Sequence, residues 1–79
     1  MPVGRSRNHA LATAFGARLR EVRHARGLSQ EALAHAASLY PTYISNCERG
    51  YSAPTLETLL RLAAALEVMP SALVDDLEY

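Results

Sequence analysis

The chain has 79 residues, 49% of them hydrophobic, and its eight basic and eight acidic side chains give a formal charge of zero. This length accommodates one domain, and a core with one phenylalanine and no tryptophan must be built from alanine and leucine, which favours helices. No apolar run is long enough to cross a membrane and no signal-peptide hydrophobic region is present, so we expect a cytoplasmic protein without a membrane partner.

The zero net charge results from two segments of opposite charge. Residues 1–50 hold seven arginines and three acids, a balance of +4, whereas residues 51–79 hold one arginine and five acids, a balance of −4. All the basic side chains are arginine, which suits bidentate contacts with phosphate or guanine, although coding bias explains this equally well. A chain with this polarity can present a basic face to nucleic acid.

The sequence offers no pattern for a disulfide, a metal site or catalysis. Its one cysteine, Cys47, cannot form an intrachain disulfide, and three scattered histidines lack the spacing of zinc ligands. No nucleophile shares a motif with a base, no glycine-rich phosphate loop is present, and the acidic residues near Glu78 are typical of a solvated chain end. We therefore expect neither an enzyme nor a bound metal or cofactor.

The first predicted helix follows a short tail. Residues 1–8 contain proline, glycine and arginine without apolar periodicity, so we expect a flexible N-terminal tail. From His9 to Arg26, apolar residues recur every three or four positions, as on one face of a helix. This stripe consists of Leu11, Phe15, Leu19 and Val22. Gly27 then tolerates the left-handed conformation that often ends a helix.

Two short helices follow. Ser29 can cap the free amides of a helix over residues 30 to 36 or 37. After a short connection, Pro41 suits the first position of the next helix because its missing N–H has no partner there. That helix is predicted over residues 41–49 and ends at Gly50.

Two further helices complete the chain. Thr55 can cap a helix over residues 56–66, whose leucines and alanines form a broad apolar face. Met69 and Pro70 precede a shorter apolar pattern that predicts a fifth helix ending near Leu77. Five helices with short connections predict one compact all-α domain over residues 9–79.

The stretch from Gln30 to Gly50 has the pattern of a helix-turn-helix, in which the second helix lies in a DNA major groove. Ala34 provides the small side chain that a close helix crossing needs, and Ser38 occupies the turn position where glycine would be easiest. The inward side of the second helix is predicted to consist of Leu39, Ile44 and Cys47. Its outward side, small or polar, is predicted to consist of Pro41, Thr42, Ser45, Asn46 and Arg49.

The segment from Phe15 to Leu73 resembles the lambda-repressor-like family of helix-turn-helix proteins, also called the Cro, phage-repressor or XRE type. Five linked motifs occur in the family's order: RLREVR, GLSQEALA, YIS, ERG and PTLETLLRLAAAL. The resemblance implies a compact five-helix fold that binds double-stranded DNA through its helix-turn-helix. Within the family, this short chain is most similar to restriction–modification controller proteins and small phage repressors.

The resemblance also implies roles for individual residues. Gln30 corresponds to a glutamine that holds a DNA phosphate at a helix N-terminus, a place that favours anions. Arg23 and Glu48 correspond to a pair that forms a buried, structural salt bridge. Combined with the outward side of the third helix, the resemblance predicts DNA contacts from Gln30, Pro41, Thr42, Tyr43, Ser45, Asn46, Arg49, Tyr51 and Ser52. For Tyr43 and Arg49, a structural role in the fold is favoured equally.

Three residues depart from the family pattern. Pro41 stands where the family often carries arginine, glutamine or lysine, and because proline cannot donate a hydrogen bond, that base contact is absent or becomes apolar. Tyr40 replaces the usual capping residue, which weakens the helix start by about 1 kcal/mol. Cys47 replaces a larger aliphatic side chain or tryptophan. These departures leave the recognised DNA sequence undetermined.

We expect a sequence-specific transcriptional regulator, a repressor or controller, that binds a pseudo-palindromic operator as a homodimer. One small core cannot cover the short fifth helix fully, so Leu73, Val74 and Leu77 are predicted at the dimer interface. Two alternatives stay open. One is an antitoxin-type regulator with a protein partner. The other is a protein-interaction module that has lost DNA binding, which the neutral net charge and Pro41 favour.

Overall fold

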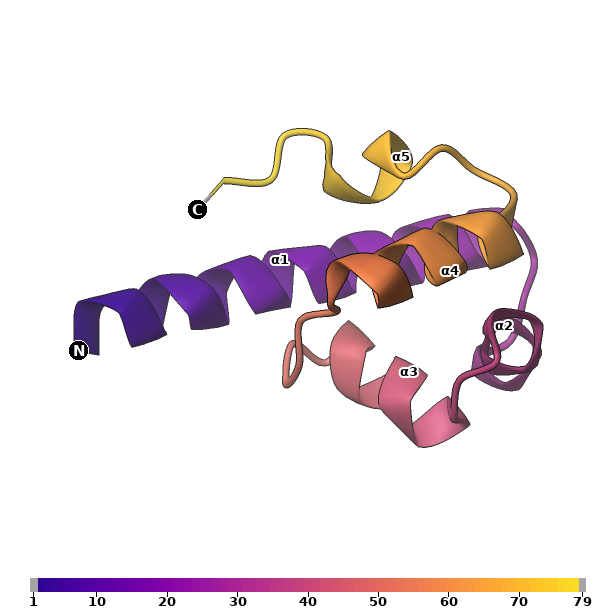
Figure 1. Ribbon diagram of the computed structural model, residues 1–79, viewed down its shortest axis with the longest axis horizontal. Coiled ribbons are helices and arrows are strands. Elements are labelled where there is room, and N and C mark those ends of the chain that lie inside the picture. The colour runs from indigo at the N-terminus through magenta and orange to yellow at the C-terminus, as the bar shows by residue number, and fades with distance from the viewer. Residues whose placement is uncertain (1, 79) are drawn as a thin grey trace.

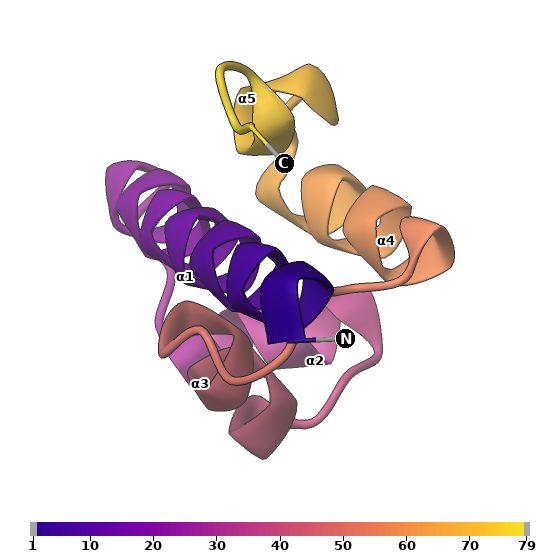
Figure 2. The same ribbon diagram turned by 90° about the vertical axis from the view of Figure 1, so that its left-hand side faces the viewer.

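The computed structural model describes residues 2–78, which form five helices and no strand (Figure 1). The helices are α1 (Pro2–Ala25), α2 (Gln30–Ala37), α3 (Pro41–Glu48), α4 (Leu56–Leu66) and α5 (Ser71–Val74). The long helix α1 has α2 and α3 on one side, α5 on the opposite side and α4 alongside it, and the perpendicular view shows the same separation (Figure 2). This arrangement confirms the predicted all-α fold.

Local capping and backbone geometry set both ends of α2 and the start of α4. The hydroxyl of Ser29 accepts a hydrogen bond from the backbone N–H of Ala32 at 3.0 Å, and that of Thr55 accepts one from Thr58 at 3.2 Å. Ser38 has a φ of 59°, so it occupies the left-handed region that favours glycine. This conformation, which costs about 1 kcal/mol, reverses the chain tightly between α2 and α3.

The start of α1 differs from the prediction. The helix begins at Pro2, whereas the sequence predicts a flexible tail over residues 1–8 and a helix start at His9. Proline is well accommodated in the first helical turn, and an existing helix extends at little cost, so helical geometry continues beyond the apolar stripe. Met1, Tyr79 and the side chains of residues 2–8 lie outside the described part of the structure.

The C-terminal helix is shorter than predicted. It covers only Ser71–Val74, because Asp75 leaves the helical path with a ψ of 133° and Asp76 follows with a left-handed φ of 67°. The apolar pattern over residues 70–77 therefore belongs to a short helix followed by an irregular segment. None of the helices within residues 2–78 has the length and hydropathy needed to cross a membrane.

Side chains from all five helices form the core. Its fully buried large side chains are Leu19, Leu33, Ile44, Cys47, Leu62, Leu66 and Leu73. Leu73 is thus a core residue, and the prediction that it lies at a dimer interface is wrong, because α5 packs against α1 within the same chain and covers it. The other two predicted interface residues are more open, with Val74 38% exposed and Leu77 half-buried.

A single arginine of α1 holds the C-terminal segment. The guanidinium of Arg18 donates hydrogen bonds to the carbonyl oxygens of Ala72 at 3.0 Å and of Asp75 at 2.8 Å. Carbonyl groups at a helix C-terminus lack partners within the helix and carry partial negative charge, so a cation there is favourable. Arg18 thereby fixes the four-residue α5 against α1.

The crossing of α1 and α3 depends on Gly16, which the sequence pattern does not single out. A Cβ atom at this position would lie 2.1 Å from the carbonyl oxygen of Cys47 and 2.8 Å from that of Glu48. Both obstacles are backbone atoms, so no side-chain rotation can relieve the clash. The absent side chain therefore sets how closely α3 approaches α1.

We expect Gly16→Ala to destabilise the protein by about 1–3 kcal/mol, the cost of overpacking a close contact. Helix propensity alone predicts the opposite sign, a gain of up to about 1 kcal/mol when alanine replaces glycine inside a helix. Urea unfolding followed by circular dichroism measures the sign. Ala17→Ser, at an exposed neighbouring position, is the control and should change stability little. A stabilised Gly16→Ala variant would contradict the close crossing.

Candidate nucleic-acid interface

The second helix of the helix-turn-helix, α3, is anchored by one face. Ile44 and Cys47 are fully buried, Leu39 in the preceding turn is half-buried, and Ala34 of α2 is fully buried beside them. In both views α3 lies at the edge of the molecule opposite α5, with no other helix on its outer side (Figures 1 and 2). Its outer face is therefore open to a partner.

The predicted contact residues of α3 lie on this outer face to different degrees. Pro41 and Thr42 are exposed, whereas Ser45 and Asn46, one turn further on, are half-buried but accessible. None of these side chains is large or charged, so the surface of a partner molecule can approach the helix backbone closely.

The segment after α3 adds an exposed aromatic–cation pair. The guanidinium carbon of Arg49 lies 5.1 Å from the centre of the Tyr51 ring, within the range of a cation–π contact. Tyr51 is 69% exposed and Ser52 is half-buried. Arg49 and Tyr51 are thus accessible together beside the C-terminal end of α3.

Tyr43 has a different environment from the other predicted contact residues. Its half-buried ring packs against the core. Burial raises the pKa of Tyr43 to about 12, and its contact with Cys47 adds to the shift, so the hydroxyl stays protonated at neutral pH. The thiol of Cys47 is itself fully buried, and burial raises its pKa, which keeps it unreactive.

A buried network joins three helices behind the outer face of α3. The Nε of Arg23 donates to Oε2 of Glu48 at 2.5 Å, and its Nη2 donates to Oε1 at 3.0 Å, while their side chains are only 8% and 4% exposed. The amide Nε2 of Gln30, the first residue of α2, also donates to Glu48 Oε1, at 3.0 Å. The remaining Arg23 Nη1 donates to the carbonyl oxygen of Leu28 at 2.9 Å.

The network keeps both charges ionised. Burial by itself raises the pKa of Glu48, but the hydrogen bonds from Arg23 and Gln30 outweigh it, and the net pKa lies below the ordinary value of 4.5. The hydrogen bond with Glu48 raises the pKa of Arg23. The pair of Arg23 and Glu48 is therefore a bidentate, charge-assisted contact whose partners satisfy each other.

Gln30 has a partner that sequence reasoning missed. The resemblance predicts its side chain on a DNA phosphate, and in the structure one amide N–H is donated to Glu48. The second amide N–H of Gln30 is not part of this bond, and in the first turn of α2 only the backbone N–H of Ala32 is capped, by Ser29. No spacing rule indicates this bond, because residues 30 and 48 approach only when α2 and α3 fold back on each other. Among the described residues, no cluster of histidine, cysteine and acidic side chains could hold a metal ion.

A short helix, a tight turn and a second helix with an accessible polar face define a helix-turn-helix protein, the class whose second helix lies in the major groove of DNA. A family model described as a helix-turn-helix domain matches residues 14–77. The chain therefore belongs to the helix-turn-helix family of transcriptional regulators, of the lambda-repressor or XRE type.

Individual relatives support this family. The chain is 40% identical to the HTH-type transcriptional regulator DdrOP3 of Deinococcus deserti over 78% of its own length, and it spans about half (48%) of that protein. It is 39% identical to the control protein C.BamHI of Bacillus amyloliquefaciens, covering 77% of this chain and 76% of that one. The crystal structure of the restriction-modification controller protein C.AhdI from Aeromonas hydrophila matches with a TM-score of 0.79 and 45% identity, over 81% of this chain and 97% of that one.

Replacing Arg23 with methionine leaves the Glu48 carboxylate buried with Gln30 as its remaining partner, so we expect the free energy of unfolding to fall by about 3–5 kcal/mol. Adding Glu48→Gln removes the uncompensated charge, and the double variant should be more stable than Arg23→Met alone. Urea unfolding measures all three proteins. A double variant that is no more stable than Arg23→Met would show that charge compensation is not what the pair provides.

The same pair predicts a dependence on pH. Because the pKa of Glu48 is lower in the folded than in the unfolded state, its contribution is present above the ordinary value of 4.5 and is lost as pH falls through the folded-state value. Between about pH 5 and pH 3, the free energy of unfolding should therefore fall more steeply for the natural protein than for Glu48→Gln. Parallel pH profiles would contradict this assignment.

Proposed function

We propose that this protein is a sequence-specific transcriptional regulator, a repressor or controller rather than an enzyme, that binds a pseudo-palindromic operator in the cytoplasm as a homodimer. The observation that carries the proposal is the accessible outer face of α3, whose small polar side chains are exposed at Thr42 and half-buried but accessible at Ser45 and Asn46. The names of the control protein and the transcriptional regulator to which the chain is similar support it.

The roles of the contact residues follow from their places in the fold. The N-terminus of α2 with the free amide N–H of Gln30 can hold a phosphate, because the first backbone N–H groups of a helix lack partners and favour anions. Asn46 can donate to N7 and accept from N6 of adenine. Beyond the end of α3, the neighbouring DNA backbone can be held by Arg49, Tyr51 and Ser52, as the family pattern predicts.

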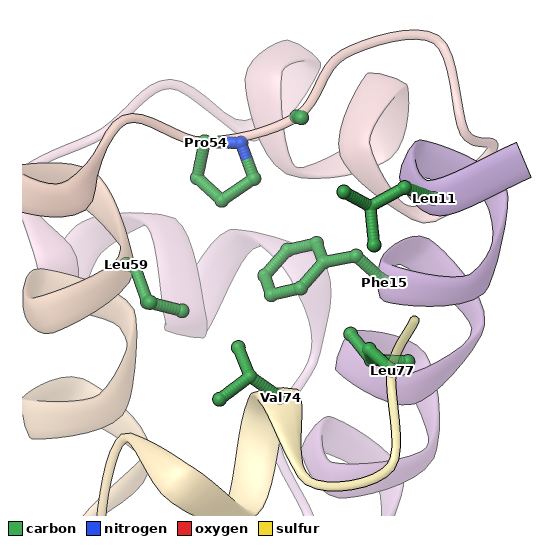
Figure 3. Close-up of a pocket in the computed structure, with 7 residues that line it drawn as sticks. Leu11, Phe15, Pro54, Leu59, Val74 and Leu77 are labelled. Carbon is green, nitrogen blue, oxygen red and sulfur yellow. The ribbon is translucent and has the colours of Figure 1, made fainter. Parts of the chain in front are cut away.

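An apolar hollow supports self-association. It has a volume of about 330 Å³ and lies between α1, α4 and the C-terminal segment (Figure 3). The side chains that converge on it are Leu11, Phe15, Pro54, Leu59, Val74 and Leu77. Leu56 and Leu60 of α4 are also exposed, at 72% and 48%. Apolar side chains exposed to water on so small a domain favour burial against a second copy of the chain.

The proposed dimer differs from the interface that the sequence predicts. The proposed interface contains the exposed leucines of α4 and excludes the buried Leu73. Val74 and Leu77 remain candidate interface residues. A twofold axis relating two copies would set two α3 helices against successive major grooves, and the half-sites would then be one turn of DNA apart, about 34 Å.

Titration of labelled duplex DNA tests the assignment of contacts. We expect affinity to fall steeply with salt, because phosphate binding releases counterions. Asn46→Ala should lose about 1–3 kcal/mol on the preferred sequence only, whereas Gln30→Ala should weaken binding on every sequence by about fivefold. Ser71→Ala, exposed on the opposite side of the molecule, is the matched control. Binding that is absent or insensitive to salt would favour a protein-interaction module instead.

Sedimentation equilibrium tests the dimer. Placing a carboxylate at the hollow with Val74→Glu should raise the dimer dissociation constant at least about tenfold, since a charge would have to be buried at the contact. Met69→Glu replaces a side chain that is also apolar but is more exposed, at 73%, and lies outside the hollow, so it should leave the dissociation constant unchanged. Monomer alone at high micromolar concentration of the natural protein would refute the homodimer, and co-purification with a second protein would favour an antitoxin-type regulator.

A further inference from the structure

The outer face of α3 is uncharged along its whole length. The helix sequence PTYISNCE contains one carboxylate, that of Glu48, and no lysine or arginine. The carboxylate of Glu48 is already paired with Arg23 and Gln30 behind the helix. Arginine and lysine make the commonest specific contact with guanine, a paired bond to O6 and N7. Within α3, no side chain can make this contact.

The leading end of α3 is apolar as well as uncharged. Tyr40, the residue before the helix, is 81% exposed, and its side chain makes no capping hydrogen bond. Pro41, in the first turn, is exposed, and it has neither a backbone N–H nor a polar side-chain atom to donate. Thr42, which follows, is also exposed and carries a methyl group on its side chain. In a helix-turn-helix, residues at this end of the second helix contact the base edges.

The major groove offers one apolar group at the base edges, the C5 methyl of thymine. A proline ring pressed against guanine would leave the O6 and N7 acceptors without partners, which costs desolvation energy, whereas against thymine it buries the methyl. Asn46 lies one turn beyond Thr42 on the same face, where it can bond an adenine. The two contacts thus favour the same kind of base pair.

We propose that Pro41 and Thr42, flanked by Tyr40, determine specificity by packing on thymine methyl groups, so that the base pairs facing the start of α3 are A·T. This inference depends on the proposed function, because it names the DNA that the same face recognises. It assigns to Pro41 a positive role in recognition, in place of the hydrogen-bonding side chain that it lacks.

The experiment begins with the full chain and a library of random DNA duplexes, from which bound sequences are selected. Each thymine of the selected duplex is then replaced singly by uracil, which removes the methyl group and keeps base pairing. At one or two positions in each half-site, we expect affinity to fall about fourfold, because the complex no longer buries the methyl group of that thymine. Pro41→Ala should reduce that loss, whereas Asn46→Ala, the matched control, should retain it.

A further variant tests whether residue 41 determines the choice between A·T and G·C base pairs. Pro41→Arg supplies a guanine-binding side chain at the same place, so a second selection should enrich G·C at the positions where the natural protein enriches A·T. The proposal is overturned if every uracil duplex binds as tightly as its thymine parent, or if Pro41→Ala loses as much affinity on uracil as the natural protein. If no duplex is enriched and binding does not depend on salt, the proposed function itself fails, which the first titration detects separately.

Discussion

The ion pair between Arg23 and Glu48 is the constraint on which the placement of α3 depends. The helix is short and buries only Ile44 and Cys47 fully, so apolar packing alone gives it a small anchor. A bidentate contact at one end, shielded from water, fixes both the distance and the rotation of α3 against α1. The missing side chain of Gly16 lets the two backbones approach closely enough for that contact. Gln30 joins the same carboxylate, so the phosphate site proposed at α2 and the outer face of α3 are held in one rigid unit.

The sequence predicts best those features that adjacent residues decide. Thr55 and the leucines after it predict α4 with the bounds that the structure has, and Ser38, at the turn position where glycine would be easiest, takes the left-handed conformation. These outcomes depend on capping and backbone geometry, which act over three or four residues. The length of α5 and the burial of Leu73 could not be predicted in this way. Both depend on contacts with α1, which lies more than fifty residues away in the chain.

The candidate site divides along the same line. Helical periodicity identifies which residues of α3 face outward, because the inward positions are fixed by the buried Ile44 and Cys47. Periodicity does not identify the hydrogen bond from Gln30 to Glu48 or the stacking of Arg49 on Tyr51, since both depend on side-chain conformation after folding. The opposite net charges of residues 1–50 and 51–79 accord with an α3 that contains no lysine or arginine. If arginines outside α3 supply attraction to the phosphates, the helix itself is free to discriminate among bases by shape.

The two hydrogen bonds from Arg18 to the C-terminal segment link the proposed dimer to the folding of the chain. A helix of four residues is not stable by itself in water. The order of α5 therefore depends on α1, whose Arg18 donates two hydrogen bonds to carbonyl oxygens of the C-terminal segment. Val74 and Leu77 keep their places in the hollow only while these hydrogen bonds hold. A chain whose first helix is frayed or incomplete would therefore lack the part of the proposed dimer surface that Val74 and Leu77 form. The proposed association would then be limited to molecules whose α1 and C-terminal segment are correctly folded.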